Sequence, residues 1–345
     1  MSLRSEILEQ PAVLERLLDS QRKRVEEIAQ TIRDREVRSI FLAARGTSDN
    51  AGLYAKYLWG SMNRLPVALA APSLFTIYRT PPDLTGQLVV GISQSGQSPD
   101  IVSVVAEGRR QGALTLAVTN DASSPLAEET EMVLEIGAGT ESAVAATKTY
   151  TCQLLAIAML SAALRDDGQL FEVLERLPVL VDETLALEGA IEGAAQRFRY
   201  MDQCVVIGRG YNYATAYEWA LKLKELTYVV ADPYSPADFQ HGPIAIVSQG
   251  FPVLAAAPMG AVFDDALSLL AKLVKDNGAE LLAVSNDQRA LDLAQTPLSL
   301  PEDLPEWLSP LVAIVPAQLF CYHLTRAKGY DTEAPRQLVK VTRTW

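Results

Sequence analysis

Three charged residues have the spacing of one helix face and are candidates for acid–base chemistry. Glu218, Lys222 and Glu225 stand four and three residues apart in a stretch that reads as a helix, so their side chains can act together. A carboxylate can move a proton between adjacent carbons, provided that partial burial raises its pKa toward the working pH. The same spacing also fits a solvated row of ion pairs, but the flanking Trp219 and Leu223 leave little room for a fully exposed helix.

Two more residues are candidate catalytic groups. His241 stands in the Pro- and Gly-bounded loop ADFQHGP, and the charge of histidine changes near neutral pH without special help. The other histidine, His323, lies in the apolar helical pattern LFCYHLTRA and is interpreted as a core or surface residue. Lys340 lies between Val339 and Val341 near the C-terminus. A disordered basic end is one interpretation, and the alternating apolar residues instead predict a tail that packs down and delivers Lys340 into a site.

Hydroxyl and amide side chains gather in three stretches of the N-terminal half. They are RGTSDNAG (45–52), SQSGQS (93–98) and ESAVAATKTYT (141–151). An apolar run that opens into such residues is typical of a buried parallel strand followed by a turn and a helix N-terminus. Backbone N–H groups and hydroxyls in such turns suit a bound anion, although serine and threonine also serve as ordinary helix caps. Because three polar turns are predicted to follow strands, we favour a phosphate-binding site. None of the three is a P-loop or a dinucleotide fingerprint.

Strand-like and helix-like segments alternate along the chain, which predicts βαβ units around parallel sheets. SIFLAARG, LVVGISQSG and LTLAVTND read as strands of a first sheet, and the same order returns in QCVVIGRG, FPVLAAAP and AELLAVSND. GALTLAVTND matches GAELLAVSND, and AARG matches IGRG at nearly the same offset, so the sequence predicts an internal duplication.

The predicted elements divide the chain into five parts. At 345 residues the chain exceeds what one hydrophobic core usually serves. We expect an N-terminal helical lead-in at 1–34, a first α/β domain at 35–165, a helical linker at 166–194, a second α/β domain at 195–330 and a C-terminal tail at 331–345 that contributes to the active site.

The composition argues against several classes of protein. The chain has 30 basic and 42 acidic residues and a net charge of −12, which disfavours nucleic acid or an anionic membrane as a partner. Its longest apolar run, 154–164, is short of the roughly 20 residues of a spanning helix and reads as a core helix. No signal peptide is visible, and Cys152, Cys204 and Cys321 lack metal or disulfide spacing. We therefore expect a cytoplasmic protein that needs no metal or other cofactor.

These motifs together resemble the sugar isomerase (SIS) domain family, and specifically the isomerase half of the glutamine–fructose-6-phosphate aminotransferases. EQP, GTS, SQSG, VAATKTYT, GRG, ALKLKE, HGP and PRQLVKVT occur in the family's order over essentially the whole chain. The resemblance implies an α/β fold with two tandem flavodoxin-like three-layer αβα domains, each built on a parallel sheet. It also implies a phosphorylated sugar as ligand and a homodimer.

The resemblance also assigns roles to individual residues. It implies that Glu225 moves a proton between C1 and C2 of the ring-opened sugar, with Glu218 and Lys222 as supporting residues. It implies that His241, which a neighbouring subunit can supply, assists ring opening, and that Lys340 forms a Schiff base with the keto sugar. The residues implied at the sugar phosphate are Gly46, Thr47, Ser48, Ser93, Gln94, Ser95, Ser98, Val144 and Ala146.

The chain departs from the family pattern at several positions. Ala146 replaces a serine of the family's sugar site, and Gln240 stands where the family has a lysine before the histidine. No cysteine precedes Cys152, so we expect no glutaminase domain. The favoured function is an amino-sugar phosphate deaminase/isomerase that converts glucosamine 6-phosphate and water to fructose 6-phosphate and ammonia. The alternatives are an enzyme for another amine adduct, such as fructosamine 6-phosphate or an N-acetylgalactosamine-derived sugar phosphate, and a non-catalytic sugar-phosphate sensor.

Overall fold

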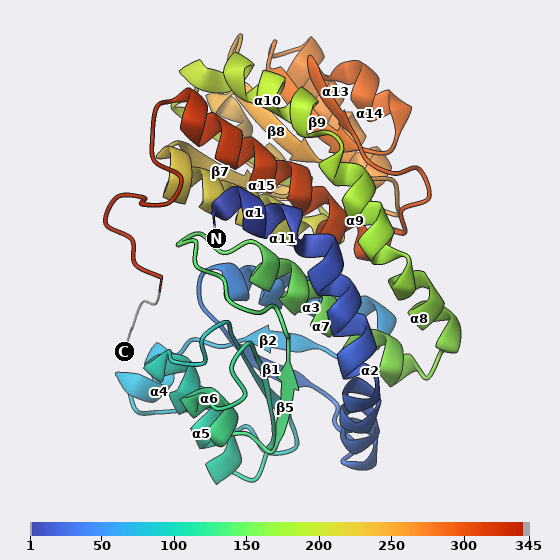
Figure 1. The fold of residues 1–345 in the computed structure, drawn as a ribbon, viewed down its shortest axis with the longest axis vertical. Coiled ribbons are helices and arrows are strands. Elements are labelled where there is room, and N and C mark those ends of the chain that lie inside the picture. Colours follow the sequence, from blue (N-terminus) through green and yellow to red (C-terminus); the bar gives the residue numbers. More distant parts are fainter. Residues whose placement is uncertain (1, 341–345) are drawn as a thin grey trace. The chain divides into compact units, whose positions relative to one another are not determined.

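The structure, a computed structural model, describes residues 2–340 and contains two five-stranded sheets (Figure 1). Its residues group into two compact units. The first-sheet unit comprises Glu9–Ser142, Ala146–Pro178 and the described residues of Val339–Trp345. The second-sheet unit comprises the described residues of Met1–Leu8, with Ala143–Ala145 and Val179–Leu338. The predicted domain boundaries stay predictions, because this grouping does not show which segment folds alone.

The first-sheet unit is a parallel sheet with a helix in each crossover. Its helices are α2 (Gln10–Asp34), α3 (Thr47–Met62), α4 (Ser73–Thr76), α5 (Pro99–Arg110), α6 (Pro125–Glu128), α7 (Lys148–Arg165) and α8 (Gly168–Glu175). Its strands are β1 (Ile40–Ala43), β2 (Val67–Leu69), β3 (Leu88–Ser93), β4 (Leu114–Thr119) and β5 (Met132–Glu135), in the order β2-β1-β3-β4-β5. β3 and β4 are buried along their whole length, as strands covered on both faces must be.

Helices cover both faces of the first sheet. α4, α5 and α6 pack together on one face, and α2, α3 and α7 pack together on the other (Figure 1). Successive residues of β1 show the two sides: Ala43 belongs to the apolar cluster that includes Val104 of α5, whereas Leu42 occupies the space that a Cβ on Gly52 of α3 would take. The unit therefore has three layers, as the family resemblance implies.

The second-sheet unit repeats this architecture. Its helices are α1 (Leu3–Leu8), α10 (Glu188–Arg197), α11 (Tyr213–Lys222), α12 (Pro236–Gln240), α13 (Phe263–Lys275), α14 (Gln288–Leu293) and α15 (Ser309–Ala327), with short helical turns η1 (Phe198–Tyr200), η2 (Gly210–Asn212), η3 (Leu223–Thr227), η4 (Pro243–Ile246) and η5 (Glu306–Leu308). Its strands are β6 (Gln203–Gly208), β7 (Val230–Tyr234), β8 (Pro252–Ala256), β9 (Glu280–Ser285) and β10 (Thr296–Ser299). Read as β7-β6-β8-β9-β10, the order matches that of the first sheet, as the predicted duplication requires. α9 (Leu177–Leu185) begins in one unit and ends in the other.

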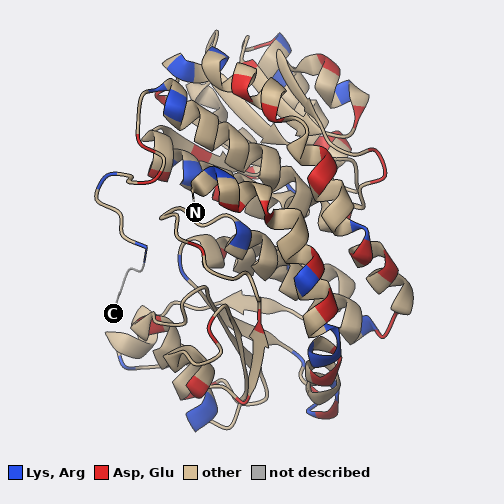
Figure 2. Cartoon of the chain, in the orientation of Figure 1, with Lys and Arg blue, Asp and Glu red and all other residues tan. Residues whose placement is uncertain are grey.

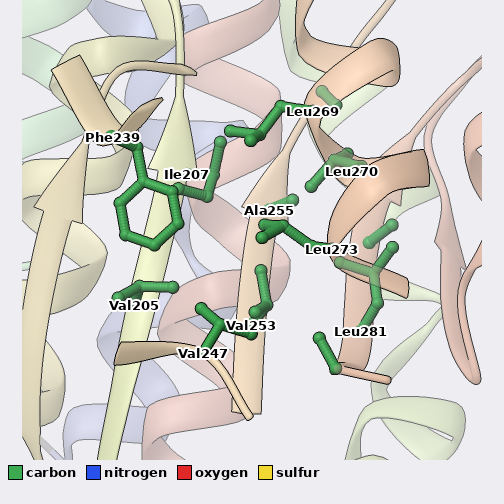
Figure 3. Close-up of a cluster of buried hydrophobic side chains, with 13 residues drawn as sticks. Val205, Ile207, Phe239, Val247, Val253, Ala255, Leu269, Leu270, Leu273 and Leu281 are labelled. Carbon is green, nitrogen blue, oxygen red and sulfur yellow. The ribbon is translucent and has the colours of Figure 1, made fainter. Parts of the chain in front are cut away.

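A cluster of buried hydrophobic side chains joins one face of the second sheet to α13 (Figure 3). Val205 and Ile207 of β6 and Val253 of β8 meet Leu269 and Leu273 of α13 in this cluster. Alternate residues of each strand face the helix, which is the pattern of a sheet packed on both sides. Each such side chain contributes about 1.5–3 kcal/mol through burial, so the cluster is a major source of stability for this unit.

The longest apolar helices belong to the cores. α7 carries the apolar run 154–164 and buries most of its residues, which confirms the predicted core helix. Among residues 2–340, one helical segment, Glu306–Ala327, is long and apolar enough to cross a membrane by length and composition alone. Within its most apolar window 94% is buried inside the protein, as in the core helix of a globular unit.

Charged residues of both signs are distributed along α2 (Figure 2). Arg22 pairs with Glu26, and Arg24 pairs with Glu27, across successive turns of the exposed side of the helix. Such exposed pairs contribute only about 0.3–0.5 kcal/mol each. The buried side, which includes Leu14, therefore holds the helix in place, as in an amphipathic helix.

All three cysteines are free and buried. Burial raises the pKa of the thiols of Cys152, Cys204 and Cys321. The thiolate form is therefore suppressed, and the three side chains serve as small apolar core residues.

Candidate functional site

The turn between β1 and α3 places two hydroxyls at the carboxyl edge of the first sheet. Gly46 has φ +54°, a conformation that glycine adopts without strain and that lets the chain turn directly into α3 at Thr47. Ser48 is buried, and its Oγ accepts a hydrogen bond of 2.9 Å from Nε2 of Gln153 in α7. A hydroxyl that accepts from one side keeps its own hydrogen for donation to another group. The Oε1 atom of Gln153 is also buried and has no hydrogen-bond partner among the described residues.

The turn after β3 is tighter and depends on one glycine. Ser93 Oγ accepts the N–H of Gly96 at 3.1 Å, and Ser95 Oγ accepts the N–H of Gln97 at 3.3 Å. Gly96 has φ +62°, and a Cβ there would lie 2.1 Å from Oγ of Ser124. Only glycine therefore fits this turn, which holds both serine hydroxyls at the end of β3.

The hydroxyls of these turns do not serve as ordinary helix caps. Gly46, Ser98 and Thr147 are the N-cap residues of α3, α5 and α7, and none of them makes a side-chain capping bond. Ser124, by contrast, caps the short α6 through its side chain. The alternative that these hydroxyls are ordinary caps is therefore wrong for Ser98 and Thr147.

An ion pair links the turn after β1 to the first turn of α5. Nε of Arg45 donates to Oδ2 of Asp100 at 2.7 Å, and the other carboxylate oxygen of Asp100 accepts the N–H of Ile101 at 2.9 Å. The Asp100 side chain is fully buried, whereas 51% of the Arg45 side chain is exposed. The pair fixes the guanidinium two residues before Thr47 and beside the helix that follows Ser98. Sequence reasoning missed this role, although a basic residue directly before a hydroxyl-rich turn was a usable signal.

A polar cleft of about 530 Å³ lies at the carboxyl ends of β3, β4 and β5. Its lining residues are Gln94, Asn120, Glu135, Gly137, Gly139, Thr140 and Glu141. This edge is where parallel sheets bind their ligands. Of the lining residues, Gln94 was predicted at the sugar phosphate, and Glu141 begins the third polar stretch. The Asn120 side chain holds the segment that follows β5 in place. Its amide N–H donates to the carbonyl of Gly139 at 2.8 Å, and its carbonyl oxygen accepts the N–H of Ala138 at 2.8 Å.

The third polar stretch is not a turn that directly follows a strand, and that prediction is wrong. β5 ends at Glu135, well before Glu141, and the last part of the stretch is already helix α7 from Lys148 onward. The two residues of this stretch that the family resemblance places at the sugar, Val144 and Ala146, are half-buried. Val144 belongs to the second-sheet unit and Ala146 to the first-sheet unit.

The tail residue Lys340 is held by an ion pair. Its Nζ lies 2.6 Å from Oε2 of Glu141, and 24% of its side chain is exposed. Leu338 and Val339 are exposed, so apolar packing does not hold the tail as predicted; Val341 lies outside the described residues. The sequence did not indicate that Glu141 is the acidic partner of Lys340.

The charged cluster of the second-sheet unit is buried. Nζ of Lys222 lies 3.4 Å from Oε1 of Glu218 and contacts Oε2 of Glu225 more closely. The side chains of Glu218 and Lys222 are 0% and 2% exposed, so the alternative of a solvated row is wrong. Glu225, at 24%, is the open member of the cluster.

The predicted helix is wrong in detail at Glu225. The α-helix ends at Lys222 and continues as the π-helical turn η3, in which Thr227 Oγ1 donates to the carbonyl of Leu223 at 2.6 Å. Such turns are rare and occur often at functional sites. The altered backbone still lets Lys222 contact Glu225 and Glu218 together.

The two histidines lie in different surroundings. His241 ends α12 and is exposed, and its backbone N–H donates to the carbonyl of Asp238 at 3.1 Å; no hydrogen bond joins its imidazole to another described residue. His323 is buried, with Nε2 3.0 Å from Oε1 of Glu188, as expected of a core residue. A hydrogen bond from Arg4 lowers the pKa of that Glu188 carboxyl.

The second sheet is nearly filled at the ends of β6 and β8, the strands that correspond to β1 and β3. The cavity at the ends of β6 and β8 has a volume of only about 10 Å³, room for at most one water. Arg209, the counterpart of Arg45, contacts Asp265, and the Glu306 side chain occupies the place that a Cβ on Gly260 would take. Among residues 2–340, no group of three His, Cys, Asp or Glu side chains is arranged to hold a metal ion.

Comparison with known proteins identifies the class. The SIS domain model matches residues 35–163 and again 198–326, so the chain belongs to the SIS domain family and carries two copies of the domain. This confirms both the family resemblance and the α/β fold predicted from the sequence.

Three individual relatives show which members of the family this chain is similar to. A Thermus thermophilus glutamine–fructose-6-phosphate aminotransferase (isomerizing) is 36% identical over 349 residues, which cover 97% of this chain and 57% of that protein. A structure of a phosphosugar isomerase candidate from Silicibacter pomeroyi DSS-3 is 34% identical, with a TM-score of 0.86 and coverage of 96% of this chain and 100% of that one. The C-terminal domain of a glucosamine-fructose-6-phosphate aminotransferase from Francisella tularensis is 28% identical, again with a TM-score of 0.86, covering 96% and 98%. The chain thus spans little more than half the length of the curated relatives it matches.

Proposed function

We propose that this chain is an amino-sugar phosphate deaminase/isomerase, which converts glucosamine 6-phosphate and water to fructose 6-phosphate and ammonia. One observation carries the proposal: the ammonium of Lys340 lies against Glu141, which lines a polar cleft at the ligand-binding edge of the first sheet. A primary amine at such a cleft can form an imine with a keto sugar. The kinship with phosphosugar-converting relatives supports the same class of substrate.

The proposal assigns the phosphate to the hydroxyl turns of the first-sheet unit. Ser93 and Ser95 are held by the glycine turn, Ser48 by Gln153, and Thr47 and Ser98 stand at the starts of α3 and α5. The protein carries a net charge of −12, so its overall field repels an anion. Local donors must therefore bind the phosphate, and Arg45 supplies the positive charge beside both turns.

The chemistry proceeds through the open-chain sugar. A base removes the proton from C2 and returns it to C1, while one proton passes from the C2 ammonium to the C1 oxygen, so that C1 carries a hydroxyl and C2 an iminium. The Lys340 amine then displaces ammonia from C2, and water releases fructose 6-phosphate and the free lysine. We assign the proton transfer to Glu225, the exposed member of the charged cluster, with Lys222 offsetting the charges of the two carboxylates. We assign ring opening to His241, contributed by the partner subunit of a homodimer.

The first test measures ammonia and fructose 6-phosphate released from glucosamine 6-phosphate by wild type, Glu225→Gln and Lys340→Ala. Wild type should release both in equal amounts. Each variant should lose at least about 100-fold in kcat, as expected when a proton-transfer group or nucleophile is removed. Glu225→Gln should still bind the sugar phosphate. Full turnover by Glu225→Gln would refute the mechanism, and a fully active monomer would refute the role of His241.

Two other outcomes identify the alternatives. Turnover of fructosamine 6-phosphate or of an N-acetylgalactosamine-derived sugar phosphate, without turnover of glucosamine 6-phosphate, would show an enzyme for another amine adduct. Thermal stabilisation by all these sugars without any product would show a sensor. Running the reaction from fructose 6-phosphate and ammonium chloride establishes which direction is catalysed faster.

A further inference from the structure

Glu141 is a buried carboxylate that the proposed reaction does not use. It lies between β5 and α7, and its side chain is 0% exposed. An isolated buried carboxylate is costly, so such a group is retained only where donors and a cation satisfy it.

Four donors converge on the two oxygens of Glu141. Oε1 accepts the backbone N–H groups of Thr147 and Thr149 at 2.9 and 3.1 Å. Oε2 accepts from the Thr149 hydroxyl at 2.8 Å and from Nζ of Lys340 at 2.6 Å. Both N–H groups belong to the start of α7, where the helix dipole also favours negative charge.

Three of these donors are local, and the fourth is not. Thr147 and Thr149 are six and eight residues from Glu141, whereas Lys340 is 199 residues away. The three donors at the start of α7 therefore orient the Glu141 carboxylate without Lys340. The ammonium of Lys340 then pairs with a carboxylate that is already oriented. Among the described residues, Lys340 is the one cation that contacts Glu141.

The nearest basic residue in the sequence is committed elsewhere. Nζ of Lys148 contacts the carboxylate of Glu9 and donates to the carbonyl of Thr140 at 2.7 Å. Two separate pairs, Lys148 with Glu9 and Lys340 with Glu141, thus stand next to each other at the start of α7 without exchanging partners. Lys148 therefore does not compete with Lys340 for the Glu141 carboxylate.

We propose that Glu141 is a positioning residue, which holds the Lys340 ammonium at the wall of the cleft before substrate binds. The inference rests on the proposed function, because a fixed position of the Lys340 amine matters for catalysis only if this amine forms the imine. In the step that follows, the Lys340 ammonium loses one proton to water, and the amine attacks the iminium carbon C2 of the sugar. A bond forms between Nζ and C2, the bond from C2 to the original nitrogen breaks, and one proton passes from Nζ to that nitrogen, which leaves as ammonia. Holding Lys340 at the wall of the cleft raises the rate of this step, because the tail does not have to search for the sugar.

The first experiment requires no substrate. The full-length protein is labelled by reductive methylation with formaldehyde and cyanoborohydride, and mass spectrometry compares Lys340 with the exposed Lys56. In Glu141→Gln, which keeps the length of the side chain and an acceptor for α7, labelling of Lys340 should rise at least about tenfold, the lower end expected for loss of a charged hydrogen bond. The control Glu172→Gln removes the same charge from an exposed position of α8 and should change nothing. Equal labelling of Lys340 in wild type and a folded Glu141→Gln would overturn the inference.

The second experiment separates this inference from the proposed function. With glucosamine 6-phosphate, Glu141→Gln should lower kcat by about 10–100-fold while the Kd of the sugar phosphate changes by less than about threefold. A variant with wild-type kcat would overturn the positioning role and leave the proposed function intact. A wild type that turns over no amino sugar would refute the proposed function, and the labelling result alone would then decide whether Glu141 holds Lys340. If Glu141→Gln does not fold, Glu141→Asp, which withdraws the charge by one methylene, is labelled instead and should show the same direction of change.

Discussion

The turn after β3 offers a direct test of the site geometry through Gly96→Ala. The residue has φ +62°, and a side chain in this left-handed region costs about 1–2 kcal/mol. The new Cβ would also lie 2.1 Å from Oγ and 2.4 Å from Cβ of Ser124, an overlap that costs about 1–3 kcal/mol to relieve. Together the two effects should lower the free energy of unfolding by about 2–5 kcal/mol.

Chemical denaturation of matched variants separates strain from overlap. Gly112→Ala is the control, because Gly112 has φ +77° with nothing within 4 Å of the new Cβ, and it should lose only about 1–2 kcal/mol. Ser124→Gly removes both clashing atoms, so in that background Gly96→Ala should cost no more than the control. The background itself loses the cap of α6, in which Ser124 Oγ accepts the N–H of Ala127 at 3.4 Å, and must be measured alone.

The same variants report on ligand binding. Ser93 and Ser95 are oriented by hydrogen bonds within this turn, so Gly96→Ala should weaken glucosamine 6-phosphate binding in calorimetry while Gly112→Ala leaves it unchanged. The reasoning is refuted if Gly96→Ala is as stable as Gly112→Ala and binds the sugar phosphate as tightly. In that case the turn relaxes freely and its shape does not define the site.

Three other variants test separate contacts. Gln153→Leu removes the donor to Ser48 and should weaken sugar phosphate binding by about 3–10-fold in calorimetry; an unchanged Kd would show that this contact does not orient the hydroxyl. Lys222→Met leaves two facing carboxylates, one fully buried, and should lower the free energy of unfolding by about 3–5 kcal/mol in urea; a loss below about 1 kcal/mol would contradict the buried cluster. Arg4→Met removes the hydrogen bond that lowers the pKa of Glu188. A lowered carboxyl pKa stabilises the fold above its unfolded value of about 4.5 and loses this effect as the pH falls through the folded value, so the deficit of the variant should be full at pH 7 and shrink in acid; a constant deficit would refute it.

Local patterns in the sequence were sufficient to predict the parallel sheets and their duplication. β3 is a run of six residues that are all buried, and its apolar letters up to Ser93 already indicate a strand covered on both faces. α2 likewise follows the helical period of its apolar residues. Both signals are local, because a strand or helix shows its buried face in the spacing of its own residues.

The parts of the site that sequence reasoning missed depend on distant pairs. Glu141 meets Lys340 across 199 residues, and Arg45 meets Asp100 across 55. Periodicity reports which face of an element is buried but not which charged group it meets, so neither pair could be read from spacing. The π-helical turn at Glu225 was missed for a related reason: three- and four-residue spacings fit an α-helix, and the wider turn shows only in the backbone.

The filled edge of the second sheet has a consequence for how much ligand the protein takes up. A duplicated chain with two intact sites would bind two equivalents of sugar phosphate. Here β6 and β8, which correspond to the strands before the two hydroxyl turns of the first sheet, leave a cavity of only about 10 Å³ at Arg209 and Glu306, which is too small for a phosphate group. Titration should therefore saturate at one molar equivalent per polypeptide, with a single class of sites.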